Sequence, residues 1–267
     1  MIVDYHMHLR DEAEELAHLA GAVEPFVAAA RAAGVDEIGF SEHAFYFEQT
    51  RSLWHVPYHV DRCRHDLDPY VGAVVTAKEK GLPVKLGLEV DYEPGREDDT
   101  RAILDSYPWD FLLGSVHFVD GYAIDGEPRL IDALGVEATW ERYFAVLADA
   151  ARSGVFDVLS HPDLVKIFGD RLDGFDYAPV ADAIAEGGVA VEVSTAGLRR
   201  PVGELYPAVE LLRACRERDV PVTTASDAHV PRLVGRDFDR ALALLASAGY
   251  ETVTVFDRRE GTQVPLG

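Results

Sequence analysis

Short apolar runs alternate with longer segments of helical periodicity along almost the whole chain. This alternation predicts right-handed strand–helix–strand units whose strands lie parallel in one sheet. The expected helices cover residues 24–33, 60–80, 98–106, 136–152, 177–186, 206–218 and 238–248. The expected strands cover residues 2–3, 37–40, 84–88, 111–116, 155–159, 189–193 and 220–225, with one more at 252–256. We find no linker or internal repeat, so the 267 residues are expected to form a single domain, residues 1–267.

Histidines and acids stand at the carboxyl ends of six of these runs. They are Asp4, His6, His8, Glu42, His43, Glu89, His117, His161, Asp227 and His229. Active sites of barrels and of open α/β sheets both lie at this edge of the strands. An open sheet concentrates its site at one switch point, whereas the candidate residues here come from strands all along the sheet. A closed α/β barrel is therefore favoured over an open sheet.

The residue types and their spacing predict a multinuclear metal site. Imidazole and carboxylate are ligands of Zn, Mn and Fe. His6 and His8 are two residues apart on a strand end, so their side chains share one face and can hold the same ion. Asp227 and His229 repeat this spacing. Asp4 lies deeper on the face of His6 and His8, where it either binds metal or orients a ligand histidine.

Glu89 ends an apolar strand, where an unpaired carboxylate is costly unless a cation compensates it. A bridging position between two metals is expected for it. Taken alone, His117 or His161 is more often a hydrogen-bonded core residue than a ligand. The joint occurrence of so many such groups at strand ends favours metal binding.

The motifs at these positions carry a family resemblance. They read Asp4-Tyr5-His6-Met7-His8, Ser41-Glu42-His43, Leu86-Gly87-Leu88-Glu89, Gly114-Ser115-Val116-His117, Ser160-His161-Pro162-Asp163 and Ser226-Asp227-Ala228-His229. In this order, over almost the whole chain, they resemble the PHP (polymerase and histidinol phosphatase) superfamily. Residues 91–95 and 193–201 are similar to its histidinol-phosphate phosphatase branch, although Ser194 stands where that branch usually has Asn.

The resemblance implies a distorted (β/α)7 barrel with a trinuclear metal site at the C-terminal end of the strands. It implies one metal held by His6, His8, Glu89 and Asp227, a second held by Glu89, His117 and His161, and a third held by His43 and His229. His18 matches a further histidine that the family supplies in its first loop. That loop is longer here than usual, so Asp11 or Glu14 is an alternative to His18.

The resemblance further implies metal-dependent hydrolysis of a phosphomonoester, with L-histidinol phosphate as the favoured substrate and two to three Zn, Mn or Fe ions as cofactors. The expected catalytic residues are Glu89, Asp227 and Arg199, the expected phosphate contacts are Arg199, Arg200 and Lys166, and the candidate acids are Asp163 and Glu42. The alternatives are another small ester, such as a nucleotide or sugar phosphate, and a metal-binding barrel without enzymatic activity.

The composition argues against several classes of binding partner. A net charge of −22 repels phosphate backbones and anionic membranes, which opposes a nuclease of the same superfamily. No stretch is long and apolar enough to span a bilayer. The two cysteines lack a Cys-x-x-Cys partner, and the N-terminus enters a strand without room for a signal peptide. A cytoplasmic protein is expected, with its oligomeric state left open.

Residues 44–59 form the one irregular segment, which is rich in aromatic side chains. Its position directly after a strand with candidate ligands allows two interpretations, a lid over the site or a loop packed on the rim of the barrel. His55, His59 and His65 lack the strand context of the other histidines. We therefore expect them to be packing or surface residues.

Overall fold

Seven parallel strands form a sheet that curls into a nearly closed barrel. The computed structural model describes residues 1–9, 21–127 and 129–267. In sheet order the strands are β1 (Val3–Asp4), β2 (Glu37–Phe40), β3 (Val84–Asp91), β4 (Phe111–Ser115), β7 (Val158–Leu159), β8 (Ala190–Ser194) and β9 (Val222–Ala225). The chain around β1 meets that around β9, where the Tyr5 amide donates to the Thr224 carbonyl at 3.1 Å and the His8 amide to the Ala228 carbonyl at 2.9 Å. The predicted barrel is confirmed.

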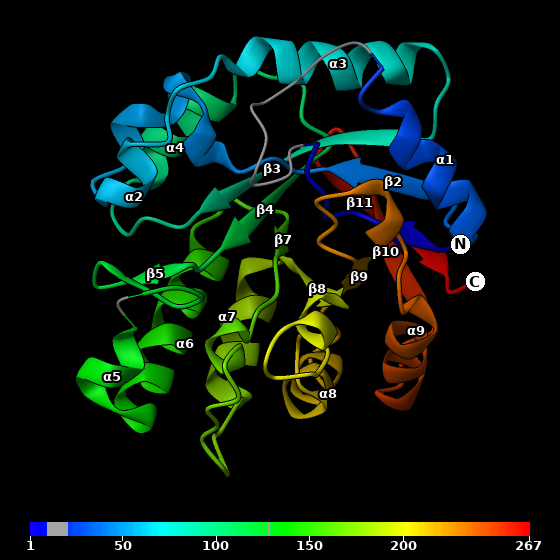
Figure 1. Ribbon diagram of the computed structural model, residues 1–267. Coiled ribbons are helices and arrows are strands. Elements are labelled where there is room, and N and C mark those ends of the chain that lie inside the picture. Colours follow the sequence, from blue (N-terminus) through cyan, green and yellow to red (C-terminus); the bar gives the residue numbers. More distant parts are fainter. Residues whose placement is uncertain (10–20, 128) are drawn as a thin grey trace.

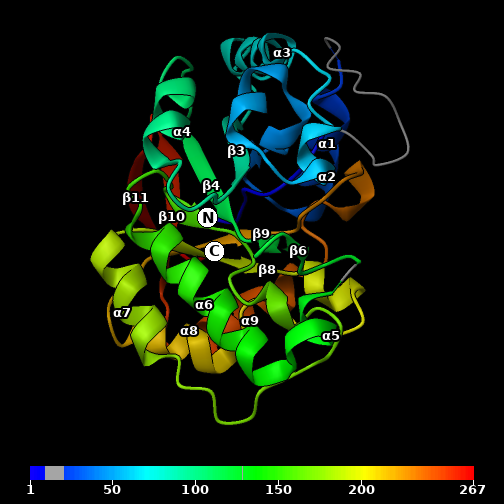
Figure 2. The same ribbon diagram turned by 90° about the vertical axis from the view of Figure 1, so that its left-hand side faces the viewer.

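Helices cover the outside of the barrel. They are α1 (Glu24–Ala33), α2 (Pro57–Val60), α3 (Leu67–Glu79), α4 (Glu97–Leu104), α5 (Leu130–Leu134), α6 (Val136–Arg152), α7 (Ala178–Gly187), α8 (Val209–Arg216) and α9 (Phe238–Ser247). Figure 1 shows α1 and α3 on one side of the strands and α6 to α9 on the other, and Figure 2 shows the same division after a quarter turn. In the described part of the chain, none of these helices is long and apolar enough to cross a membrane.

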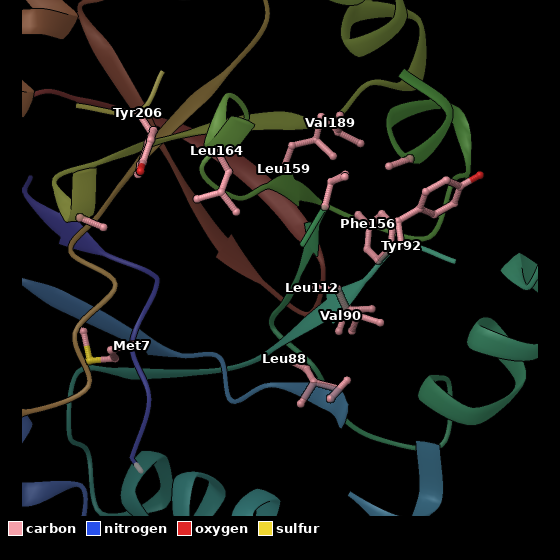
Figure 3. Close-up of a cluster of buried hydrophobic side chains, with 14 of the residues drawn as sticks. Met7, Leu88, Val90, Tyr92, Leu112, Phe156, Leu159, Leu164, Val189 and Tyr206 are labelled. Carbon is pink, nitrogen blue, oxygen red and sulfur yellow. The ribbon is translucent and has the colours of Figure 1, made fainter. Parts of the chain in front are cut away.

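The longest helix, α6, shows why these segments are helical. Trp140, Phe144, Leu147 and Ala151 recur at intervals of three and four residues and are all buried. Such spacing places them on one stripe of the helix, which packs toward the sheet. Figure 3 shows part of the hydrophobic core, where Leu88 on β3 and Leu112 on β4 come from neighbouring strands.

The helix expected at residues 60–80 is wrong at its beginning. The structure ends α2 at Val60 and starts α3 only at Leu67. Between them, Asp66 adopts an extended conformation and its carboxylate accepts a hydrogen bond from the Asp68 amide at 3.1 Å. This is an N-terminal cap, which satisfies a backbone donor that a continuous helix would have paired internally. The Asp66 cap therefore competes successfully with helix continuation.

Two antiparallel hairpins accompany the barrel. Strand β10 (Thr252–Asp257) was predicted, but its partner β11 (Glu260–Pro265) was not, because that strand is mostly exposed and lacks an apolar run. Strands β5 (Phe118–Val119) and β6 (Tyr122–Ala123) form the second hairpin, which the sequence analysis did not predict. The remaining strands and helices of the prediction are present, with ends shifted by up to three residues.

The β10–β11 hairpin closes the amino ends of the strands. The Arg259 amide donates to the Asp110 carbonyl at 2.8 Å, just before β4. Its guanidinium donates to Asp157 at 2.9 Å and to the Val155 carbonyl at 2.6 Å, just before β7. The opposite, carboxyl ends of the strands are left for the functional site.

Candidate metal centre

The predicted ligands that the structure describes converge at the carboxyl ends of the strands. Four groups of three residues each could hold a metal ion, and within each group the three ligand atoms lie within 4.8 Å of one another. They are His6, His8 and Asp227; His6, Glu89 and His161; His43, Glu89 and His117; and His8, His43 and His229. Because the groups share members, the structure brings all eight residues into one cluster. His18, like its alternatives Asp11 and Glu14, lies outside the described residues.

Glu89 is the centre of this cluster. Its Oε2 lies 2.7 Å from His43 Nδ1 and 3.3 Å from His6 Nε2, while its Oε1 lies 3.2 Å from His161 Nε2 and 3.6 Å from His117 Nε2. Burial raises the pKa of this carboxyl, but the neighbouring imidazoles lower it further, so that it lies well below its ordinary value. The two oxygens thus face different sets of histidines, which is the arrangement that a bridging ligand needs.

Asp227 completes the opposite side of the cluster. Its Oδ1 lies 3.5 Å from His8 Nε2, 3.8 Å from His6 Nε2 and 3.6 Å from His229 Nδ1. Asp227 has a φ of 51° and His161 a φ of 23°, both in the left-handed region that side chains usually avoid. Such backbone is sustained only where the surrounding structure enforces it, and it concentrates at functional sites.

The buried polar atoms of the cluster fit a divalent cation. Within the described ranges, His6 Nε2, both ring nitrogens of His8, His43 Nδ1 and Glu89 Oε2 are buried and make no hydrogen bond of ordinary geometry, although they lie close to one another. Leaving such atoms unpaired is costly, and a metal ion is the partner that imidazole and carboxylate share. The cluster is therefore a site for divalent metal.

Two carboxylates that sequence reasoning missed orient these histidines. Glu192 Oε2 lies 2.8 Å from His6 Nδ1, and Asp91 Oδ1 lies 2.7 Å from His117 Nδ1. Each contact fixes the ring so that Nε2 points toward Glu89, as is usual behind metal-binding histidines. Burial lowers the pKa of His117, but Asp91 and Glu89 outweigh it and raise this pKa to about 10. Both acids sit on buried strands, the same signal that identified Glu89.

Asp4 has neither of the roles that its position suggested. Its carboxylate accepts hydrogen bonds from the Ser226 amide at 2.8 Å, the Ser226 hydroxyl at 2.6 Å and the Gly235 amide at 2.9 Å. Burial raises the pKa of Asp4 to about 6 despite these bonds. Asp4 therefore holds the backbone next to Asp227, and among the described residues it makes no hydrogen bond to a ligand histidine ring.

A cavity of about 510 Å³ opens above the cluster. Ligands form its floor, namely His43, Glu89, His117, His161, Asp227 and His229. Apolar and aromatic groups form one wall, namely Phe45, Tyr46, Val56, Pro57, Tyr58 and Phe118. Gly121, Ala123, Asp125, Gly126, Glu127 and Arg200 complete the lining. In the segment expected to be a lid or a packed loop, Phe45, Tyr46 and Trp54 are buried, so it is a packed wall of this cavity.

The three predicted phosphate contacts have different surroundings. Arg200 lines the cavity, and among the described residues it is the only lysine or arginine that does. Arg199 is half-buried, and its guanidinium donates to the carbonyls of Thr195 and Ser226, the latter directly before the ligand Asp227. Lys166 is fully buried, 2.7 Å from Asp163. Lys166 is not among the residues that line the cavity, so the structure gives its predicted contact with phosphate no support.

Neither candidate acid lines the cavity. Asp163 is fully buried, pairs with Lys166 and accepts a hydrogen bond from the Ala208 amide at 2.7 Å. Glu42 is also fully buried, and its Oε2 lies 3.9 Å from His8 Nδ1. The structure therefore places neither carboxyl beside a leaving group held in the cavity.

A parallel barrel whose strand ends supply a cluster of imidazole and carboxylate ligands defines the class of metal-dependent barrel proteins. The family model described as the PHP domain matches residues 4–196. A Deinococcus radiodurans protein named "Probable histidinol-phosphatase" is 32% identical over 265 residues, covering 97% of this chain and 98% of that protein. The chain belongs to the PHP domain family, in its histidinol-phosphatase branch.

More distant relatives agree over the same length. The "Histidinol-phosphatase" of Lactococcus lactis is 22% identical over 262 residues, covering 94% of this chain and 92% of that protein. A crystal structure of histidinol phosphate phosphatase from Lactococcus lactis, complexed with Zn, L-histidinol and phosphate, superposes with a TM-score of 0.77 at 23% identity. It covers 98% of both chains, so the barrel fold is shared from end to end.

Proposed function

We propose that this protein hydrolyses L-histidinol phosphate to L-histidinol and phosphate in a metal-dependent reaction. The observation that carries the proposal is the cavity above the cluster, with metal ligands on its floor and Arg200, Asp125 and Glu127 in its lining. Family membership supports the same reaction, since the relatives above are named "Probable histidinol-phosphatase" and "Histidinol-phosphatase". The expected catalytic roles of Glu89, Asp227 and Arg199 remain part of this proposal.

The ligand set supports two to three ions of Zn, Mn or Fe. His6, His8 and Asp227 would hold one ion and His117 and His161 another, with Glu89 between them. His43 and His229 would hold a third, together with a ligand from the first loop such as His18. Bound divalent ions would supply Lewis acidity to the phosphoryl oxygens and lower the pKa of coordinated water to about 7.

Side chains of the protein would orient the metal ligands and bind the phosphate. Asp91 and Glu192 would keep the ligand rings in orientation, and Arg200, which lines the cavity, would donate charge-assisted hydrogen bonds to phosphate oxygens. In the net reaction the bond between phosphorus and the histidinol oxygen breaks, a water oxygen bonds to phosphorus, and the departing oxygen takes up a proton. Asp163 and Glu42, the two acids expected from the sequence, do not line the cavity, so we assign the proton to neither of them.

The cavity lining also favours the leaving group. Histidinol carries an ammonium and an imidazole, and the lining offers the carboxylates of Asp125 and Glu127 and the rings of Phe45 and Phe118. Carboxylates attract an ammonium, and aromatic faces accommodate an imidazole. A nucleotide or a sugar phosphate lacks the ammonium, so the acidic lining offers it no compensation.

The surroundings of the reaction belong to the same proposal. Cys63 and Cys215 are free and buried, which suits a reducing compartment such as the cytoplasm. The net charge of −22 supports a small phosphate ester as the partner in preference to a nucleic acid.

A panel of phosphate esters tests the proposal. Protein loaded with Zn or Mn is assayed for phosphate release from L-histidinol phosphate, its analogue without the amino group, AMP and glucose 6-phosphate. We expect kcat/KM for histidinol phosphate to exceed that for AMP and glucose 6-phosphate by roughly tenfold or more, the scale of one favourable charged contact. A preference for AMP or glucose 6-phosphate would favour the alternative ester, and a metal-loaded protein without turnover would favour a non-enzymatic barrel.

A further inference from the structure

His59 is a buried histidine that the metal cluster does not include. It lies on α2, and its side chain has no exposed surface. Its ring stacks on Phe45 with 4.9 Å between centroids, and the rings of Trp54 and Phe118 meet it edge-on at 5.1 Å and 4.7 Å. Within the described chain, neither ring nitrogen makes a hydrogen bond of ordinary geometry, but Nε2 has a charged neighbour in Asp91 at 3.4 Å. Aromatic packing alone does not explain a histidine here, because a buried polar ring is costly unless a polar group faces it.

Asp91 connects His59 with the metal cluster through a series of side-chain contacts. His59 Nε2 lies 3.4 Å from Asp91 Oδ2, while Asp91 Oδ1 lies 2.7 Å from His117 Nδ1. His117 Nε2 in turn lies 3.6 Å from Glu89 Oε1. A row of four side chains therefore runs from the aromatic wall of the cavity to the central carboxylate of the cluster.

The aromatic surroundings determine what His59 can offer. Burial lowers the pKa of His59 more than Asp91 raises it, so the ring is neutral near pH 7 and carries one N–H. Three rings hold the imidazole from different sides, which restricts its rotation. A neutral, fixed imidazole with its Nε2 toward a carboxylate is a donor that can limit how that carboxylate turns.

We propose that His59 is a positioning residue, which holds the Asp91 carboxylate in the orientation that aims His117 at the metal. With an imidazole facing each oxygen, Asp91 cannot rotate without losing one of its two neighbours. The inference rests on the metal dependence of the proposed function, but it does not depend on which ester is hydrolysed. Under this proposal, Phe45 and Phe118 have two roles, because both line the cavity and both pack against the His59 ring.

Three substitutions separate positioning from packing. His59→Phe fills the aromatic surroundings but cannot donate to Asp91, whereas His59→Gln keeps an N–H donor. His55→Phe is the control, because His55 lies in the same segment, is 68% exposed and pairs with Glu93 at 2.9 Å. Zn affinity is measured on metal-free protein by competition with a chromophoric chelator, and kcat and KM are measured on the best ester of the panel.

We expect His59→Phe to weaken the affinity for Zn by roughly tenfold and to lower kcat by a similar factor with KM nearly unchanged, as loss of a residue that supports a ligand does. His59→Gln should retain most of both quantities, and His55→Phe should match the unmodified protein. The Tm of the metal-free protein should change little in all three variants. If His59→Phe does not fold, His59→Leu takes its place in the comparison with His59→Gln.

A double-mutant comparison completes the test. Asp91→Asn combined with His59→Phe should bind Zn no more weakly than Asp91→Asn alone, because both changes interrupt one row of contacts. Unchanged Zn affinity in His59→Phe, or full additivity with Asp91→Asn, would overturn the positioning role. Because Zn affinity is measured without substrate, a wrong assignment of the ester would leave this result intact.

Discussion

The two ends of the barrel differ in whether their buried polar groups are paired within the protein. At the amino ends of the strands, Arg259 pairs with Asp157, and Lys78 pairs with Asp110. The rings of Tyr5 and Phe111 stack there with 5.2 Å between centroids. At the carboxyl ends, buried atoms of His8 and Glu89 lack hydrogen-bond partners within the described chain. One end satisfies its polar groups internally and stabilises the fold, whereas the other leaves them for ligands.

We call the carboxyl ends of the strands the open end of the barrel and the amino ends the closed end. The largest expected effect comes from removing the negative charge of Glu89, at the centre of the open end. Glu89→Gln keeps the shape of the side chain but not the negative charge that balances two cations. We expect loss of at least one metal ion per chain and a fall in kcat of about a hundredfold, the scale of removing an electrostatic element of an active site. Elemental analysis alongside the unmodified protein, which should hold two to three ions, and phosphate-release kinetics measure both effects.

Glu37→Gln is the control for that change. It is the same substitution at the opposite end of the barrel, where Glu37 accepts a hydrogen bond from the Tyr5 hydroxyl. It should leave the metal content and kcat unaltered. Near-normal metal content and turnover in Glu89→Gln would show instead that Glu89 is a structural residue and that the two ends differ less than their contacts indicate.

A smaller effect, on stability alone, is expected at the closed end. Arg259→Ala removes the partner of the largely buried Asp157 carboxylate and should lower the free energy of unfolding by about 2 kcal/mol. Kinetics per folded molecule should stay unchanged. Chemical denaturation of the metal-free protein measures the stability. Arg258→Ala is the matched control, since Arg258 is 89% exposed and shares the left-handed backbone of Arg259. Equal stabilities of the two variants would contradict the role of the hairpin as a closure.

The smallest effect is expected for the cation that lines the cavity. Arg200→Ala should lower kcat/KM about tenfold, mainly through KM and by a similar factor for every ester, because a guanidinium binds the phosphate and not the leaving group. Arg199→Ala should act differently, since Arg199 donates to the Ser226 carbonyl next to Asp227, and is expected to reduce metal retention. Initial-rate measurements and metal analysis distinguish these outcomes. A substrate-dependent effect of Arg200→Ala would place this side chain at the leaving group.

Sequence patterns predicted the open end better than the closed end. Ligands such as His6 and Glu89 follow directly from apolar strands, and parallel strands bring their ends together whatever the details of packing. Arg259 gave no signal, because its partner Asp157 lies about a hundred residues away in the chain, and only the folded barrel brings the two together. The hairpin strand β11 was missed for a related reason, since it is mostly exposed and lacks alternation.

At the carboxyl ends of the strands, the direct ligands were predicted and the supporting residues were missed, because their position on buried strands does not show which ring they face. Glu192 and Asp91 orient His6 and His117 through pairs that form only in the folded chain. Lys166 was expected at the phosphate because it follows a strand end, yet the turn after His161 directs it into a buried pair with Asp163. Charge and position along a sequence thus indicate a candidate, but the direction of a side chain depends on tertiary contacts.

The sparse positive charge of the cavity has a consequence for the order of binding. Arg200 is the only lysine or arginine lining it in the described chain, while Asp125 and Glu127 line it and the whole chain carries a charge of −22. Without ions, the carboxylates of Glu89, Asp227, Asp125 and Glu127 outnumber Arg200 and the protonated His117 in the lining. We therefore expect this field to slow the entry of a doubly charged phosphate, and added salt to speed its entry by screening the field. We expect an ordered sequence in which ions enter first and reverse the local potential, and the ester follows.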